Sequence, residues 1–200
     1  MRTRRFTAFI AVSTLALAAC GSAATGPNLP EGAFWEAFAP LCGNAYLGGM
    51  TTTYSADRDW KNSRLILHVE DCAQDGVKAN FNITEDRTRT WTFTPGEDGN
   101  INLRIGRAEG TGPGIESYGG VSTEGADAMI QIFPIDEESR AAFEEKRIML
   151  STQNVWTLGF ADEGAAFIYH VQRIASERGM RFDLSTPVPV ETPEDWEPPA

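Results

Sequence analysis

Apolar and polar side chains alternate with a period of two along most of the chain. Two adjoining segments show this most clearly, with apolar side chains on one face: Val77, Ala79, Phe81 and Ile83, and then Trp91 and Phe93. Such alternation is typical of a strand with one buried face. Similar patterns predict strands at 46–55, 64–70, 100–105, 128–133, 147–151, 154–160, 165–174 and 179–184.

The connections between these segments are short and rich in Gly, Asp and Pro, which is typical of hairpin turns. Two segments are instead predicted to be helical. Residues 30–41 place Phe34, Phe38 and Leu41 at helical spacing, and Asp136 is a suitable N-cap for a helix that ends near Lys146. Residues 106–125 hold seven glycines and are interpreted as a loop over a barrel mouth or an insertion.

About ten short strands without a βαβ rhythm predict an antiparallel sandwich or barrel. We therefore expect a mainly β protein, an antiparallel up-and-down barrel or closed meander with one or two short helices. Residues 31–184 form its single domain. An aromatic helix before the first strand would suit a lid or plug on such a barrel.

The N-terminal segment has the layout of a secretory signal peptide. Three arginines lie within residues 1–5, and an almost uncharged apolar run follows to Ala19. The run is shorter than the roughly 20 residues that a membrane-spanning helix needs. Residues 1–19 are therefore predicted to be an export signal.

The end of this segment, Leu17-Ala18-Ala19-Cys20, resembles the lipobox of bacterial lipoproteins. The resemblance implies lipidation of Cys20 after cleavage, and Gly21 in place of Asp implies transfer to the outer membrane, facing the periplasm. The alternative is an ordinary signal peptide in which Cys20 is incidental. Residues 20–30 are interpreted as a lipidated tether, and residues 185–200 as a disordered, acidic and proline-rich tail.

Acidic side chains outnumber basic ones, 28 to 17, which gives a net charge of −11. Removal of residues 1–19 takes away three arginines and no acid, so the mature chain is more acidic still. This charge argues against binding to nucleic acid or to anionic lipid surfaces, and favours neutral, cationic or apolar partners.

Apart from Cys20, the chain has two cysteines, Cys42 and Cys72. Because an exported protein enters an oxidising compartment, we expect a disulfide between them. Two unpaired buried thiols are the alternative. A zinc site is disfavoured because the two thiols lack the histidines needed to complete a tetrahedron.

Two resemblances concern the mature domain. The segment 41–49, with its glycines around Tyr46, is similar to the first strand of lipocalin-like barrels, although these have Trp two places after the first Gly. Other segments are similar to a group of uncharacterised small secreted bacterial proteins. In that group Leu-Arg precedes a His-Asp-His-Arg run; this chain has Ile105-Gly106-Arg107 there, so no metal or catalytic role is transferred.

The sequence offers little for catalysis, with two histidines and no nucleophile, zinc, phosphate or dinucleotide motif. His68 and His170 are each interpreted as structural or surface residues of a strand. We therefore assign no catalytic residues, no metal and no cofactor.

A binding cavity is the remaining candidate site. Charge is costly in a strand pattern unless it is paired or used, and two arginines share predicted faces with aromatic side chains. The candidate ligand-binding residues are Arg89, Trp91, Phe93, Trp156, Tyr169 and Arg173. The alternative is that the aromatics form the core and the arginines extend to its rim.

These patterns favour a non-catalytic envelope lipoprotein that binds a small apolar ligand or another envelope component. The alternatives are an envelope hydrolase that uses acidic residues, and a purely structural or assembly role. An enclosed aromatic cavity would support the first, converging carboxylates the second and a filled core the third.

Overall fold

The computed structural model describes residues 26–52, 57–83, 86–107 and 114–190. The predicted signal, Cys20 and residues 191–200 of the predicted tail lie outside these ranges, so the predictions that concern them stay predictions.

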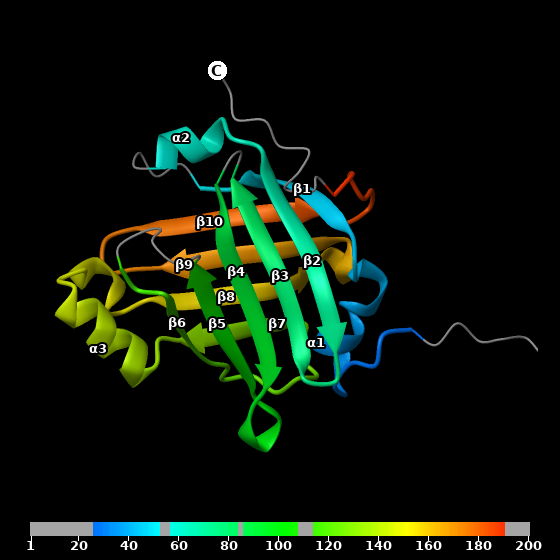
Figure 1. Cartoon of the computed structure of the whole chain (residues 1–200), viewed down its shortest axis with the longest axis horizontal. Helices are drawn as coiled ribbons and strands as arrows, with labels where there is room; N and C mark the ends of the chain where they lie inside the picture. The colour runs from blue at the N-terminus through cyan, green and yellow to red at the C-terminus, as the bar shows by residue number, and fades with distance from the viewer. Residues whose placement is uncertain (1–25, 53–56, 84–85, 108–113, 191–200) are drawn as a thin grey trace, which may run out of the picture.

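The described strands form one antiparallel sheet in which every strand pairs with a neighbour in sequence, except where the first pairs with the last. The order is β6-β5-β4-β3-β2-β1-β10-β9-β8-β7 (Figure 1). The strands are β1 (Ala45–Met50), β2 (Leu65–Ala73), β3 (Gly76–Ile83), β4 (Asp86–Pro95), β5 (Ile101–Arg107), β6 (Ser117–Val121), β7 (Ile130–Pro134), β8 (Val155–Ala161), β9 (Ala166–Gln172) and β10 (Glu177–Asp183). This confirms the predicted up-and-down β architecture.

The barrel is nearly closed, and its seam lies between β6 and β7. A bridge joins Gly120 to Ile135, and the Asp136 N–H donates to the Gly119 carbonyl at 3.1 Å. Glycine is needed at position 120 because a Cβ there would lie 2.0 Å from the Pro134 carbonyl oxygen across the seam, and at position 119 because a Cβ would lie 1.8 Å from the Leu103 carbonyl oxygen of β5. Gly120 therefore allows the two ends of the sheet to meet.

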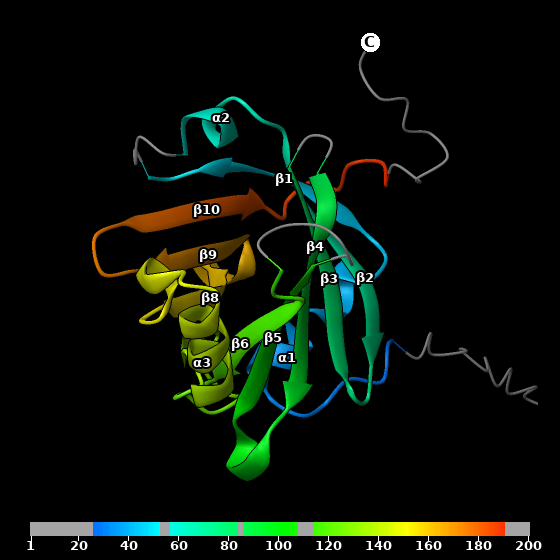
Figure 2. The ribbon, with the colours of Figure 1, turned by 60° about the vertical axis from the view of Figure 1, so that its left-hand side comes forward.

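The helix α3 (Glu137–Glu145) lies against this seam (Figure 2). Asp136 caps it by accepting a hydrogen bond from the Ser139 N–H at 2.7 Å, as predicted. The Ser139 hydroxyl accepts a hydrogen bond from the Gly119 N–H at 2.8 Å. The helix therefore completes hydrogen bonding where the ladder between β6 and β7 is sparse.

The predicted leading helix is also present, as α1 (Ala33–Glu36) followed by a 3-10 turn, Ala39–Leu41. Phe34 and Phe38 are fully buried and contact Phe93 and Phe160 in the barrel interior. This segment therefore plugs one half of the barrel with aromatic rings. In Figure 1, α1 and α3 lie on opposite sides of the molecule.

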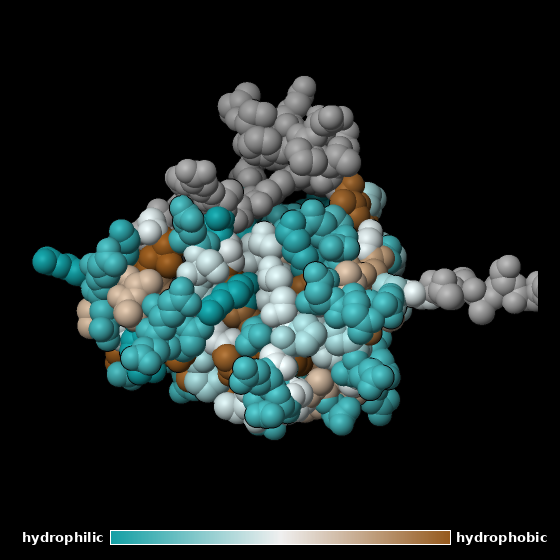
Figure 3. Space-filling view, turned by 60° about the horizontal axis from the view of Figure 1, so that its bottom comes forward, coloured by the Kyte–Doolittle hydropathy of each residue, from teal (hydrophilic) through white to brown (hydrophobic). Residues whose placement is uncertain are grey.

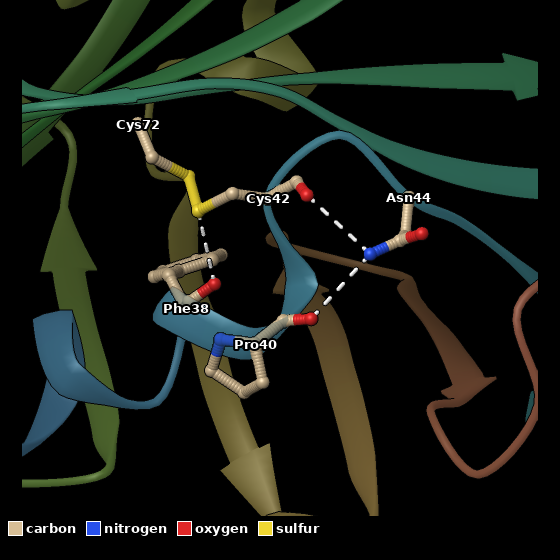
Figure 4. Close-up of a disulfide and its surroundings, with 5 residues drawn as sticks. All are labelled: Phe38, Pro40, Cys42, Asn44 and Cys72. Atoms are coloured by element: carbon tan, nitrogen blue, oxygen red, sulfur yellow. Dashed lines mark hydrogen bonds between the residues drawn. A yellow bond between two sulfur atoms is a disulfide. The ribbon is translucent and has the colours of Figure 1, made fainter. Parts of the chain in front are cut away.

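The Cys42–Cys72 disulfide is present and confirms the predicted pairing. It joins the end of the plug segment to β2 (Figure 4). Cys42 Sγ lies 3.2 Å from the Phe38 carbonyl oxygen, and the Asn44 side-chain amide donates to the carbonyls of Pro40 and Cys42. The bridge therefore fixes the plug to the wall of the barrel.

Two local predictions are wrong. Residues 147–151 were predicted to be a strand, but Met149–Ser151 is a 3-10 turn in the connection from α3 to β8. The strand β6 lies within the glycine-rich segment that was interpreted as a loop or insertion. The helix α2 (Arg58–Lys61) was not predicted.

The predicted tail also contains a described contact. The Val188 N–H donates to the Ala45 carbonyl at 2.8 Å, so the chain continues along the edge of β1 beyond residue 184. The face of the molecule that Figure 3 shows is mostly hydrophilic, with apolar side chains in small separate spots. Among the described residues, no helix has the length and apolar character needed to cross a membrane.

Candidate functional site

The half of the barrel opposite the plug contains a cavity of about 180 Å³, here called the arginine cavity. Two rings separate it from the plugged half: Trp91 on β4 and Tyr169 on β9 stack in parallel across the interior, with ring centroids 4.9 Å apart. Phe81 stacks on the other side of Trp91 at 5.2 Å. The lining residues are Trp60, Phe81, Arg89, Trp91, Ile105, Arg107, Tyr118, Phe143, Ile148, Ser151, Asn154, Trp156, Tyr169, Arg173, Arg178 and Met180.

Strand register explains why arginines surround the cavity. Arg89 on β4 precedes Trp91 by two residues, and Arg107 ends β5 two residues after Ile105. Arg178 on β10 precedes Met180 by two. Because side chains two apart share one face of a strand, each of these arginines continues an inward-facing row. The inward-facing rows thus change from apolar to cationic toward this end of the barrel.

Arg89 and Arg107 are direct cross-strand partners on β4 and β5. Like charges placed opposite each other on one face destabilise a sheet. The pKa of Arg89 is lowered from its usual value, first by burial and then by the charge of Arg107, whereas Asp86 opposes the shift. Arginine nevertheless stays protonated in proteins, so this end of the cavity holds two neighbouring positive charges.

Two of the four arginines have acidic partners. Arg89 forms an ion pair with Asp86, and Arg178 forms a bidentate pair with the buried carboxylate of Asp57. Arg107 and Arg173 have no ion pair among the described residues. Neither Asp57 nor Asp86 lines the cavity, and the described part of its lining holds no carboxylate and no histidine. The cavity is therefore cationic although the whole chain is strongly acidic.

The helix α2 adds an aromatic wall to the cavity. The guanidinium carbons of Arg178 and Arg89 lie 3.9 and 5.0 Å from the centroid of the Trp60 ring. These distances are typical of cation–π interactions, which stabilise a partly dehydrated guanidinium. Trp60 and the Asp57 pair therefore hold α2 beside two of the arginines.

On the opposite side, α3 contributes Phe143, which packs on Tyr118 with ring centroids 5.0 Å apart. Tyr118 in turn stacks on Trp156 at 5.9 Å. Burial raises the pKa of the Tyr169 hydroxyl, so that group is neutral at physiological pH. The aromatic walls therefore supply apolar surface and no negative charge.

Five of the six predicted ligand-binding residues line this one cavity: Arg89, Trp91, Trp156, Tyr169 and Arg173. Phe93 does not, because it lies two residues beyond Trp91 and packs against Phe34 and Phe38 of the plug. His68 is on the outer face of the barrel, because its neighbours Leu67 and Val69 on β2 are fully buried inside. His170 is also on the outer face, where it lies 3.4 Å from the Glu177 carboxylate.

Sequence reasoning missed Arg107, Arg178 and Trp60. A signal for the two arginines was present, because the period-two rows of β5 and β10 continue through them beyond the predicted strand ends. No such signal marks Trp60, whose place depends on how α2 folds back over the barrel. Within the described ranges, no three His, Cys, Asp or Glu side chains are placed to hold a metal ion.

The fold and the site define a mainly β, nearly closed up-and-down barrel with a cationic, aromatic interior cavity. Comparison of the chain with family models, with curated proteins and with solved structures finds no match.

Proposed function

We propose that the protein binds a small organic anion in the arginine cavity. The observation that carries this proposal is the cross-strand placement of Arg89 and Arg107 inside the barrel, together with Arg173 and Arg178. An anion between these groups relieves their repulsion and gains charge-assisted hydrogen bonds. The aromatic walls provide burial for the apolar part of the same ligand.

The cavity volume limits the ligand to about one ring. An apolar cavity of about 150 Å³ accommodates benzene, and the arginine cavity measures about 180 Å³. A monocyclic carboxylate fits this space, whereas a long acyl chain exceeds it. The ligand is thus amphipathic, with a ring-sized body and one acidic group.

This activity is non-catalytic and takes place in the cell envelope, with the protein anchored by lipid on Cys20. The signal layout and the lipobox-like sequence support the address. The Cys42–Cys72 disulfide agrees with it, because such bridges persist in oxidising compartments. A hydrolase that uses acidic residues is not favoured, since none of the described residues that line the cavity carries a carboxylate.

The first test compares the binding of a charged compound with that of an uncharged compound of nearly the same shape. Isothermal titration calorimetry is carried out on the exported chain bearing Cys20→Ser, with phenylacetate and its neutral isostere phenylacetamide. We expect phenylacetate to bind at least about tenfold more tightly, and its affinity to fall as salt is added. Equal binding of the two compounds, or no binding of the acid, would contradict the proposal.

A matched pair of variants locates the site. Arg107→Gln removes a cavity guanidinium, and Arg104→Gln removes one that faces outward, where it pairs with Asp136 and Glu138. We expect the first variant to lose about tenfold in affinity for phenylacetate and the second to bind like the parent chain. An equal loss in both variants would place the binding elsewhere.

A further inference from the structure

Two cavity residues stand opposite each other at the ends of neighbouring strands. Val155 of β8 pairs with Gln172 of β9, so Asn154, one residue before, and Arg173, one residue after, continue the same antiparallel register. Side chains directly opposite in such a pair have Cβ atoms roughly 5 Å apart. Asn154 and Arg173 both line the arginine cavity.

Each of these side chains has a buried polar atom without a hydrogen-bond partner among the described residues: Oδ1 of Asn154 and Nε of Arg173. Asn154 is 2% exposed. Native proteins satisfy nearly all buried polar groups, so such atoms call for an explanation. Two of them at adjacent positions in one cavity point to a ligand that pairs with both.

The two atoms ask for opposite chemistry. Arg173 Nε is a donor on a cation, and it suits a carboxylate oxygen. Asn154 Oδ1 is an acceptor, and it can only be satisfied by an N–H or O–H group. Arg178 differs from Arg173 because it already holds Asp57 through two hydrogen bonds. Arg89 forms an ion pair with Asp86, but its buried Nη1 also has no hydrogen-bond partner among the described residues.

We infer that the ligand carries a hydrogen-bond donor next to its carboxylate, as a 2-hydroxy acid does. This inference rests on the proposed function. In the bound state the carboxylate accepts from Arg173 Nε, the adjacent hydroxyl donates to Asn154 Oδ1, and the ring occupies the aromatic part of the cavity. Asn154 is thus the residue that distinguishes a hydroxy acid from the plain acid.

The test uses three acids with the same phenyl ring. They are phenylacetate, its 2-hydroxy derivative mandelate (both enantiomers), and α-methoxyphenylacetate, in which the hydroxyl of mandelate is methylated. Titration calorimetry on the Cys20→Ser chain measures their affinities. We expect one mandelate enantiomer to bind about tenfold more tightly than phenylacetate. The methoxy compound, which lacks the donor, gains nothing.

Variants at Asn154 then assign the preference. Asn154→Leu, and Asn154→Ala as a second substitution, should abolish the gain for mandelate while phenylacetate still binds. Asn82→Leu is the control, because Asn82 also has a buried Oδ1 without a partner but does not line the cavity. It should keep the full preference for mandelate.

The outcomes separate the two proposals. If none of the acids binds, the proposed function fails and this inference fails with it. If phenylacetate and mandelate bind equally well, the anion site stands and the inference about the donor is overturned. If the preference for mandelate survives in both Asn154 variants, the assignment to Asn154 is overturned.

Discussion

At the scale of single residues, the buried pair of Asp57 and Arg178 is the contact that most constrains the cavity. The side chain of Asp57 is 2% exposed and receives two hydrogen bonds from the guanidinium, which also lies over Trp60. A buried charge is tolerated because its partner is in place. The pair thus links α2 to β10 and sets the position of one cavity arginine.

We predict that Asp57→Asn lowers the free energy of unfolding by about 3 kcal/mol or more, because it leaves Arg178 partly buried without a counter-charge. Urea denaturation at neutral pH measures this. Asp162→Asn is the control: Asp162 pairs with Arg181 in the same chemical way, but on the surface, with side chains 63% and 41% exposed. It should cost less than about 1 kcal/mol. Equal losses in the two variants would show that burial does not decide the effect.

Residue type and spacing predicted much of the candidate site. Arginine within an aromatic, period-two row has few explanations, and Arg89, Trp91 and Tyr169 all line the cavity. What spacing does not encode is depth along the barrel: Phe93 repeats the pattern of Trp91 but meets the plug. Nor does it reveal Asn154, whose role depends on the strand opposite.

At the scale of elements, the N-cap of α3, Asp136, connects this helix to a strand beside the seam of the barrel. Asp136 accepts from Ser139 and also pairs with Arg104 of β5. Burial alone would raise the pKa of the Asp136 carboxyl, but the hydrogen bonds from Ser139 and Arg104 outweigh it and hold that pKa below its usual value. The ionised carboxylate is therefore the form that stabilises the fold.

We predict that Asp136→Ala lowers the free energy of unfolding by about 1 kcal/mol at pH 7. Because folding lowers the pKa of this carboxyl, its contribution is present above the unfolded value of about 3.9 and is lost as the pH falls through the folded value. Urea titrations from pH 7 to pH 2.5 should therefore show the parent and the variant converging in acid. Glu138→Gln, at an exposed first-turn position, should change stability little at any pH; a constant gap between parent and Asp136→Ala would contradict the mechanism.

Two segments differ from the prediction, each for a reason that lies outside its own sequence pattern. Residues 147–151 carry apolar side chains that suit a strand, yet Met149 and Leu150 are exposed in a 3-10 turn because α3 ends just before them. β6 carries Gly119 and Gly120, which weaken a strand signal but are needed for close approach to β5 and, across the seam, to β7. For β6, local pattern fails because the strand lies where the barrel closes, and closure is a property of distant strands.

At the scale of the whole molecule, the disulfide fixes the plug that fills one half of the barrel. Cys42 and Cys72 are separated by 30 residues, and the loop that they close contains β1 and α2. In the chain-entropy model, a bridge of this span contributes about 3 to 4 kcal/mol.

We predict that reduction lowers the free energy of unfolding by about that amount, as measured by urea denaturation with and without a thiol reductant. The double variant Cys42→Ser with Cys72→Ser should match the reduced parent and should not respond to reductant. If the reduced and oxidised forms unfold at the same urea concentration, the bridge is not a stabilising feature of this fold.

The pairing of the first strand with the last has a consequence for the order of folding. Gly48 of β1 pairs with Phe182 of β10. The barrel therefore cannot form until the chain has been synthesised almost to its end. Contacts so distant in sequence form slowly, because a long loop must be closed before they are gained. A chain that is exported as we propose benefits from this delay, since it stays unfolded and can be translocated across the membrane before it folds.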